Sequence, residues 1–439
     1  MFGRWFSTTF AAMAEPNFRI LWVGSLFATL AFMMMFVTQS VVAFELAGTN
    51  SAVGIVSLGV GLTMLILGPF GGVTADRVSK RKLIILGQGS AVVLFAVIGV
   101  LLVSDVLTLL MLILLTAALG LGFAFMGPAR HAYVADLVEP RALPNAVALS
   151  QLGHGGGQIL APVLAGVLLS TAAIGSGGTY LLMAVLVFIG VASIGMLPST
   201  PGRAASERGS VLHDLRAGVN HVRSRPTLRL ILLLFVAVIV LGSLFRVVLP
   251  ALLERHLDRD PTDIGLMFSI NAVAGFTVSL GMAGLVGTRW VWPALFVLTF
   301  MLGVGYFALA AAPSFGFALL SMALIGPGFS SFILLSQTVI MANTAPAFYG
   351  RVMSLTMLAF GLQSIVALPF GMLADEMGER EVIVLLGIAT LGVVVLGLMG
   401  YAGMRRRLPV EVASDLMAVA VREVPMMAKQ KPGRRPTPS

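Results

Sequence analysis

The amino-acid sequence predicts an all-α integral membrane protein with twelve transmembrane helices arranged as two six-helix bundles. Two observations predict this fold class. Of the 439 residues, 58% are hydrophobic and only 11% are charged, whereas a soluble domain carries about 25% charged residues. The apolar residues also form continuous runs of about twenty, the length that crosses a bilayer core. Such runs are about twice as long as the strands of a membrane β-barrel, so a barrel is disfavoured.

The apolar runs divide the chain into two similar halves. The first half predicts helices at 18–43, 52–73, 83–103, 106–127, 143–170 and 179–197, and the second half at 227–252, 262–287, 291–311, 315–338, 350–373 and 382–403. The expected domains are a lead-in (1–17), a first bundle (18–198), a linker (199–226), a second bundle (227–404) and a basic disordered tail (405–439). Within the linker, an amphipathic surface helix is indicated by the spacing of Val211, Leu215, Val219 and Val222.

The distribution of Lys and Arg predicts the orientation. If residue 1 is inside, the inner loops carry thirteen Lys and Arg, the opposite loops carry three, and the tail adds eight. Positive residues in short loops stay in the cytoplasm, so both termini are predicted to be cytoplasmic and the membrane is the plasma membrane, in bacteria the inner membrane. The net charge of +9 follows from this bias, so we expect the lipid bilayer and no nucleic acid as partner, and a monomer.

Residue patterns exclude common enzyme classes. The chain has no Cys and only five His, and it contains no HExxH pair, no GxSxG elbow, no Walker loop and no dinucleotide-binding fingerprint. We therefore expect no enzyme activity, no metal and no cofactor.

The stretch GGVTADRVSKRK at 71–82 places five charges directly after an apolar run. It resembles motif A of the major facilitator superfamily, which lies between the second and third helices. The pattern is filled by Gly72, Asp76, Arg77, Lys80 and Arg81, while Ser79 replaces its second glycine. The resemblance implies a latch at the inner face: Asp76 caps the start of the eleventh helix and the basic residues tie the second and fourth helices together. If these charges served topology alone, Asp76 would have no role.

Two further stretches resemble parts of the same superfamily. GHGGGQILAPVLAGVLL, in the fifth helix, is similar to motif C of the drug/proton antiporters, which implies a hinge formed by Gly157, Ala161, Pro162, Ala165 and Gly166. A merely structural small-residue packing face is the alternative. The segment 127–149 is similar to the connection between the fourth and fifth helices in bacterial siderophore and macrolide exporters.

This last resemblance suggests further roles near the inner membrane face. Asp136 is a candidate partner for Arg77 or Arg81, and Arg351, at the start of the eleventh helix, is a second latch partner. Arg130 lines the inner vestibule in this interpretation, or it snorkels to the interface.

Ionisable and polar groups deep in spanning helices are candidates for substrate or proton binding. His154 and Gln158 lie one turn apart in the fifth helix, and a His there either couples to protons or is a neutral side chain satisfied by backbone. Arg246 in the seventh helix either attracts an anionic substrate or pairs with Glu254. The run from Phe32 to Phe36 predicts an apolar, adaptable cavity, although Met and Phe also face lipid.

Taken together, these patterns predict a secondary active transporter that works by alternating access. Proton-coupled efflux of an amphipathic small molecule, such as a drug, a siderophore or a similar metabolite, fits best. A lipid or lysolipid flippase of the same fold is the alternative within transport, and a membrane channel or receptor is the alternative from a different class.

The latch hypothesis predicts that Asp76→Asn reduces transport without reducing membrane insertion. The amide keeps the size of the side chain but removes the negative charge that a helix N-terminus favours. The measurement is the transport rate divided by the amount of protein in the membrane. Full activity in the variant would remove Asp76 from the latch.

Overall fold

The computed structural model describes residues 11–139, 142–199, 211–282, 285, 288, 290–345 and 348–407. The described part is helical and includes twelve helices that are long and apolar enough to cross a membrane. The first six are α2 (Pro16–Ala47), α3 (Asn50–Arg77), α4 (Lys80–Val103), α5 (Leu109–Leu137), α6 (Leu143–Ser170) and α7 (Gly175–Gly195). The second six are α9 (Pro226–Leu257), α10 (Ile264–Met282), α11 (Val291–Ala310), α12 (Phe315–Ala342), α13 (Tyr349–Met377) and α14 (Glu379–Arg407).

The predicted fold class is therefore confirmed. Most helices extend a few residues beyond the apolar runs, because polar residues continue the helix past the hydrocarbon core. Some ends are shorter than predicted: α5 begins at Leu109 and not at 106, α7 ends at Gly195 and not at 197, and α11 ends at Ala310 and not at 311. α10 ends at Met282, and part of the segment predicted to continue it to 287 lies outside the described residues. Three short helices complete the described part: η1 (Ala11–Ala14), η2 (Pro261–Asp263) and α8 (Val211–Arg223), which lies in the linker where the amphipathic pattern was found.

Local chemistry sets the helix boundaries and pairs many hydroxyl groups inside the spans. Pro16 and Pro226 stand at the first position of α2 and α9, where proline has no hydrogen bond to lose. The hydroxyl of Thr108 caps α5 by accepting a hydrogen bond from the Met111 amide. Within the spans, the hydroxyl groups of Thr116 and Thr299 donate hydrogen bonds to a backbone carbonyl one turn earlier. These hydroxyl groups are therefore paired within their own helix, where the apolar surroundings offer no water.

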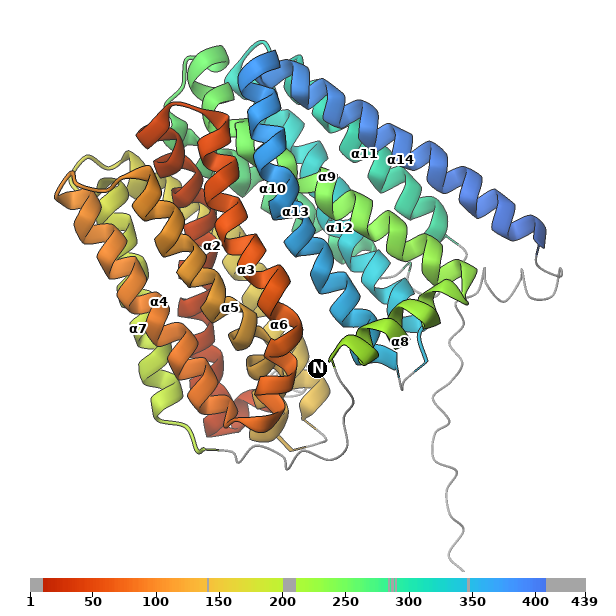
Figure 1. Cartoon of the computed structure of the whole chain (residues 1–439), viewed down its shortest axis with the longest axis horizontal. Coiled ribbons are helices and arrows are strands. Elements are labelled where there is room, and N and C mark those ends of the chain that lie inside the picture. The colour runs from red at the N-terminus through yellow and green to blue at the C-terminus, as the bar shows by residue number, and fades with distance from the viewer. Residues whose placement is uncertain are drawn as a thin grey trace, which may run out of the picture.

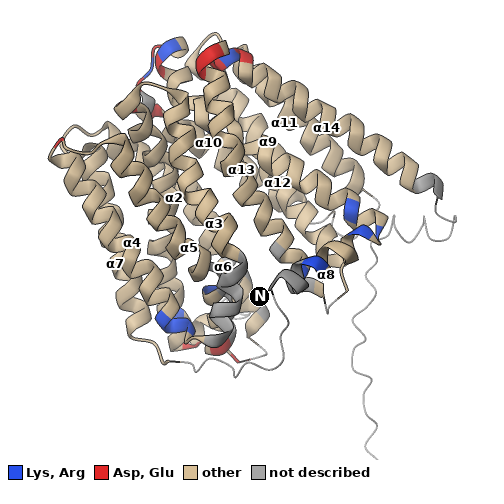
Figure 2. Cartoon of the chain, viewed as in Figure 1, with Lys and Arg blue, Asp and Glu red and all other residues tan. Residues whose placement is uncertain are grey.

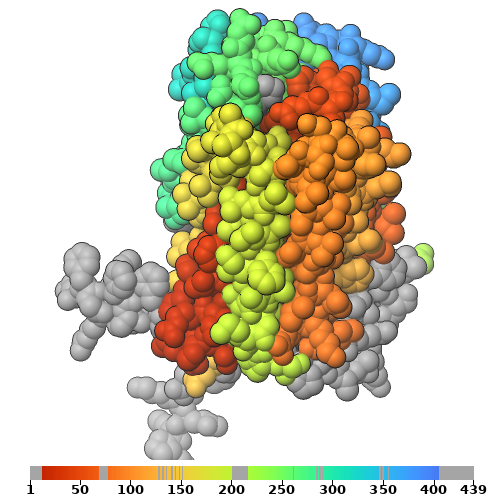
Figure 3. Space-filling model, turned by 90° about the vertical axis from the view of Figure 1, so that its left-hand side faces the viewer, coloured from red at the N-terminus to blue at the C-terminus, as the bar shows by residue number. Residues whose placement is uncertain are grey.

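The twelve spans form two bundles of six (Figure 1). In the first bundle α4 packs on α7 and α3 on α5, and in the second α10 and α11 pack on α12. Figure 3 shows α4 and α7 side by side with α6 on the outer face of the first bundle. Large apolar side chains are exposed along these helices, among them Val93, Val100, Val185 and Phe188, and such an apolar face suits contact with lipid.

The bundles meet mainly through two helix pairs, α3 with α13 and α6 with α10. Glycine allows the close approach in both. A Cβ on Gly61 of α3 would lie 1.9 Å from the Cβ of Ser364 in α13, and a Cβ on Gly265 of α10 would lie 2.5 Å from the Cα of Gly166 in α6. Any side chain at Gly61 or Gly265 would therefore push the bundles apart.

Charged side chains gather at opposite ends of the helices (Figure 2). We call one the acidic end; its carboxylates include Glu45, Asp105, Asp258, Asp375 and Glu379. We call the other the basic end; its cations include Lys80, Arg81, Lys82, Arg225 and Arg351. The ribbons of the two bundles come together at the acidic end and diverge toward the basic end (Figure 1).

Candidate functional site

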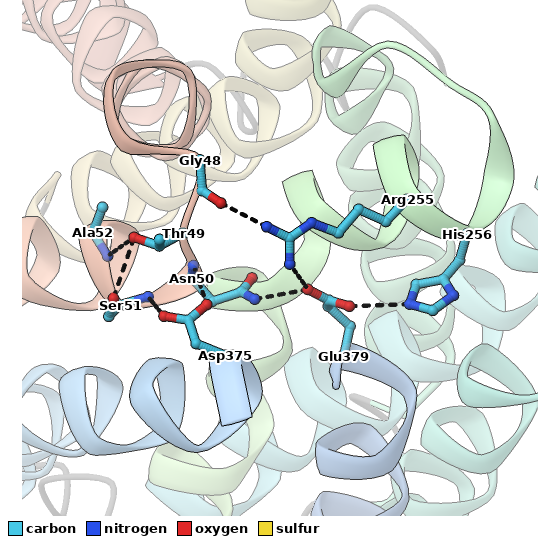
Figure 4. A network of polar contacts seen from close by, with 9 residues as sticks. All are labelled: Gly48, Thr49, Asn50, Ser51, Ala52, Arg255, His256, Asp375 and Glu379. Carbon is cyan, nitrogen blue, oxygen red and sulfur yellow. Dashed lines mark hydrogen bonds and ion pairs between the residues drawn. The ribbon is translucent and has the colours of Figure 1, made fainter. Parts of the chain in front are cut away.

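At the acidic end, the loop between α2 and α3 lies against three elements of the second bundle (Figure 4). α2 ends at Gly48, whose φ of +65° is a left-handed conformation that favours glycine. α3 starts two residues later, at Asn50. The backbone amides at the start of α3 therefore have no partner within the helix and point toward the second bundle.

Asp375, near the end of α13, supplies the missing acceptor. Its carboxylate accepts hydrogen bonds from the backbone amides of Asn50 (2.7 Å) and Ser51 (2.9 Å). A negative charge at a helix N-terminus is stabilised by the free amides and by the helix dipole, typically by about 0.3–1 kcal/mol at an exposed site. The first bundle's α3 is thus capped by a side chain of the second bundle.

Glu379, the first residue of α14, forms the second half of this contact. Its carboxylate accepts hydrogen bonds from the Asn50 side chain (2.8 Å), Arg255 (2.8 Å) and the His256 imidazole (3.0 Å), and only 3% of its side chain is exposed. A buried carboxylate is tolerated only with such partners. Arg255 also donates to the Gly48 carbonyl (2.6 Å), so it joins both bundles directly.

We call this set the acidic-end gate: Gly48, Asn50, Ser51, Arg255, His256, Asp375 and Glu379. Within this set the contacts are hydrogen bonds and ion pairs. Polar contacts of this kind exchange with water when the surfaces separate, which makes the closed arrangement stable but reversible. The gate can therefore close one end of the space between the bundles.

The sequence analysis missed this gate, although a signal was present. GMLADEMGER at 371–380 repeats the spacing of GGVTADRVSKR at 71–81: Gly371, Ala374, Asp375 and Arg380 stand where the earlier stretch has Gly72, Ala75, Asp76 and Arg81. Gly378 occupies the position that Ser79 takes in the first copy. A comparison of the two halves for this motif would have singled out Asp375.

At the basic end, the structure describes part of the predicted latch. Lys80 pairs with Asp136 (2.5 Å), which joins α4 to α5. The guanidinium of Arg81 donates instead to the carbonyls of Ile194 (3.2 Å) and Gly195 at the end of α7. Asp136 therefore pairs with a basic residue of the motif, but with Lys80 and not with Arg81, because Lys80 begins α4 directly beside Asp136. The side chain of Arg77, the other predicted partner, lies outside the described residues.

The remaining latch residues are only partly described. The side chains of Gly72, Asp76 and Arg77 lie outside the described residues, although the backbone places all three in the last turns of α3. The guanidinium carbon of Arg351 lies 5.3 Å from the ring centre of Phe348. Arg351 also packs on α8, where a Cβ added to Gly218 would lie 3.2 Å from the Cβ of Arg351.

The predicted hinge lies where α6 touches both bundles. A Cβ on Gly157 would lie 2.8 Å from Thr29 of α2, while Gly166 faces Gly265 of α10. Pro162 lies inside α6 between these two contacts, and Ala161 and Ala165 are fully buried. Because Pro162 removes one helix hydrogen bond between the two contacts, α6 can bend there.

Three of the predicted substrate or proton groups belong to the first bundle and have partners. Arg130 of α5 donates to the Ser25 carbonyl (3.1 Å) and to the Thr29 hydroxyl (3.4 Å) of α2. His154 and Gln158 of α6 are exposed and hydrogen-bonded to each other at 3.1 Å. The predicted common face of this pair is thus confirmed.

Arg246 differs, because no carboxylate or carbonyl of the described residues binds it. Its Nε is enclosed without a hydrogen-bond partner, and Glu254 is exposed and forms no ion pair with it. The guanidinium instead lies 5.6 Å from the ring centre of Phe268, 5.9 Å from Phe329 and 6.0 Å from Phe245. The alternative that Arg246 pairs with Glu254 is wrong in this structure.

The expected role of the Phe32–Phe36 run is also corrected. Met34 and Met35 are fully buried, and Phe32 packs on Phe123 with ring centres 4.7 Å apart. Phe36 is exposed. Most of this run therefore fills the core of the first bundle and does not line a cavity.

The comparisons with known proteins agree with this architecture. A family model described as Major Facilitator Superfamily matches residues 21–367. The enterobactin exporter EntS of Citrobacter koseri is 27% identical over 347 residues, which cover 77% of this chain and 80% of that protein. The EntS exporter of Escherichia coli O127:H6 is 29% identical over 290 residues, covering 64% and 67%. A crystal structure of a POT family transporter has the same fold, with a TM-score of 0.69 at 14% identity over 88% of this chain and 96% of the other.

The gate geometry predicts that Glu379→Gln opens the acidic end. The amide removes the negative charge that Arg255 and His256 bind. Because hydrogen bonds to charged groups are stronger than those between neutral groups, we expect the fraction of molecules with an open acidic end to rise about tenfold. Because the chain has no Cys, Ser364→Cys provides a unique reporter on the α13 surface that faces α3. We expect a membrane-impermeant maleimide, added to intact cells, to label this reporter about tenfold faster in the Glu379→Gln background.

Glu376→Gln is the matched control, because Glu376 is exposed and lies outside the gate. It should leave the labelling rate unchanged. Equal labelling rates with and without Glu379→Gln would contradict the role of Glu379 in closure.

Proposed function

The chain belongs to the Major Facilitator Superfamily, and from this membership we propose that it exports an amphipathic small molecule from the cell in exchange for protons. It is a multi-pass membrane transporter of the plasma membrane, in bacteria the inner membrane, and not an enzyme. The substrate class, the direction and the driving ion are the proposal. The observation that carries it is the acidic-end gate, which joins the two bundles through hydrogen bonds of Asp375, Glu379 and Arg255.

We propose that the acidic end faces outward and the basic end faces the cytoplasm. The support is the excess of Lys and Arg in the loops of the basic end, because such loops resist translocation. In this orientation the gate closes the outer end of the space between the bundles. Rocking of the bundles about α6 and α13 would then break the gate and bring the basic ends together, where Asp76 and Arg351 are the proposed latch.

Export, and not import, is favoured by two observations. The relatives in the comparison are named as exporters of enterobactin, and Pro162 lies inside α6, where it can act as the hinge that the antiporter motif implies. Because no nucleotide-binding motif occurs in the sequence, a proton gradient is the proposed drive. One chain contains both bundles, so a monomer is sufficient for alternating access.

The export proposal predicts a lower cellular content of amphipathic compounds in cells that produce the chain. Erythromycin, novobiocin and extracted cell metabolites would be measured by mass spectrometry in cells that lack the chain or produce it. We expect the content of at least one compound to fall severalfold and to recover when a protonophore is added. Unchanged content of every compound would reject export, and a fall that resists the protonophore would reject proton coupling.

A second prediction concerns His154, whose imidazole is the exposed titratable group on α6. Histidine changes charge between about pH 5 and 8, so export by the wild type should vary with pH in this range. We expect His154→Ala to flatten the profile, while His221→Ala, in α8, should retain it. An unchanged profile in His154→Ala would remove this residue from the coupling scheme.

A further inference from the structure

We infer that Arg246 and the three phenyl rings around it form a binding site for an aromatic anion, in which the arginine receives a carboxylate or phenolate and the rings receive the aryl body. The inference deepens the proposed export function, since it assigns a substrate class to a site between the membrane-spanning helices. The site lies wholly in the second bundle: Arg246 and Phe245 come from α9, Phe268 from α10 and Phe329 from α12.

The depth of Arg246 in the membrane favours a functional role over a structural one. It lies eleven residues before the end of α9 at Leu257, which is about 16 Å of helix, too far for its side chain to reach the water beyond the acidic end. A charged side chain at this depth is retained in membrane proteins mainly where it has a function. An unpaired buried charge destabilises the fold unless a partner arrives.

The bonding of Arg246 shows that the partner is absent from the described part of the protein. The Nε has no acceptor, and none of the described carboxylates forms an ion pair with the guanidinium. Arg130, the other intramembrane arginine, is a useful contrast because a carbonyl and a hydroxyl of α2 accept its hydrogen bonds. The donors of Arg246 are thus open to an external acceptor, and a guanidinium favours the planar, two-oxygen geometry of a carboxylate.

The surroundings of Arg246 specify the rest of the ligand. Three ring centres lie between 5.6 and 6.0 Å from its central carbon, within the range of cation–π attraction. Phe268 and Phe329 are only partly buried, so both rings retain surface for contact. Rings that hold the cation by their faces also offer edges for stacking against a second aromatic group. A cation would be repelled by the charge of Arg246, and a neutral sugar would leave that charge unpaired.

A second unpaired donor lies on the same part of α10. The Nδ2 of Asn271 is buried without a hydrogen-bond partner, and Asn271 follows Phe268 by three residues, so the two share one side of the helix. Further along α10, the ring of Phe276 would lie 3.2 Å from a Cβ on Gly155 of α6. The helix that carries Phe268 and Asn271 therefore also reaches the first bundle beside His154, which connects the site with the moving interface.

The test compares two ligands of one shape that differ in charge. Radiolabelled naphthalene-2-carboxylate and naphthalene-2-carboxamide would be bound to the purified full-length protein in detergent, and their dissociation constants measured by equilibrium dialysis at pH 7.5. We expect the wild type to bind the carboxylate about 10- to 100-fold more tightly than the amide, the range for a hydrogen bond to a charged group. In Arg246→Gln the two constants should become equal, mainly through loss of carboxylate binding.

The matched control is Arg259→Gln, because Arg259 is an exposed arginine 4.8 Å from the ring of Phe315 and lies outside the site. It should keep the preference of the wild type. Equal constants in the wild type, or an unchanged preference in Arg246→Gln, would overturn the inference. Because binding is measured without transport, a failure here differs from a failure of the export assay.

Thermal unfolding of the same variants separates a binding role from a structural one. An unpaired intramembrane charge destabilises the ligand-free protein, so Arg246→Gln should raise Tm without ligand and lose the increase in Tm that the carboxylate gives the wild type. A large fall in Tm in Arg246→Gln without ligand would mean that Arg246 holds the helices together, and would overturn the inference.

Discussion

The contact between a carboxylate of one bundle and a helix N-terminus of the other is the interaction on which this architecture depends. The Asp375 carboxylate accepts hydrogen bonds from the backbone amides of Asn50 and Ser51. These amides have no acceptor within α3, because the helix begins there. The contact is strong when the geometry is right and is replaced by water when it is not. Beside it, the Glu379 carboxylate accepts hydrogen bonds from Asn50, Arg255 and His256. Closure of the acidic end therefore requires several partners that are distant in sequence. In the proposed mechanism, such an interface is either closed or open, because its partners separate together.

The apolar part of the interface supports the same behaviour. Where α3 meets α13 and α6 meets α10, glycines let the backbones come close, and such smooth surfaces can slide or tilt without a large side-chain barrier. The interior of each bundle differs, since aromatic and branched side chains such as Phe32, Phe95 and Tyr180 interlock there. Each bundle is therefore packed to move as a unit, and motion is concentrated at the interface between bundles.

Much of the fold follows from the sequence, whereas the gate does not. Continuous apolar runs fix the number and approximate limits of the spans because the bilayer requires a set length. The gate joins Asn50 to residues more than 320 positions away, and single side chains at helix ends carry no periodic signal. Likewise, the pairing of Lys80 with Asp136 and the burial of Met34 and Met35 depend on how helices rotate against one another, which composition does not specify. The unpaired state of Arg246 is also visible only once its neighbours are placed.

The repeated Gly-x-x-Ala-Asp pattern has a mechanical consequence. One copy ends α3 and the other ends α13, and these two helices run antiparallel and pack closely between Asn50 and Leu65 of α3 and Gly361 and Gly371 of α13. A tilt of α3 against α13 that brings their ends together on one side of the membrane separates their ends on the other side. In the proposed mechanism, where Asp76 closes the basic end, the balance between the two conformations is set by the difference in strength between the two copies and not by the strength of either. Substitutions around one aspartate would shift this balance in small steps. Weaker contacts at one copy would be offset by equally weaker contacts at the other.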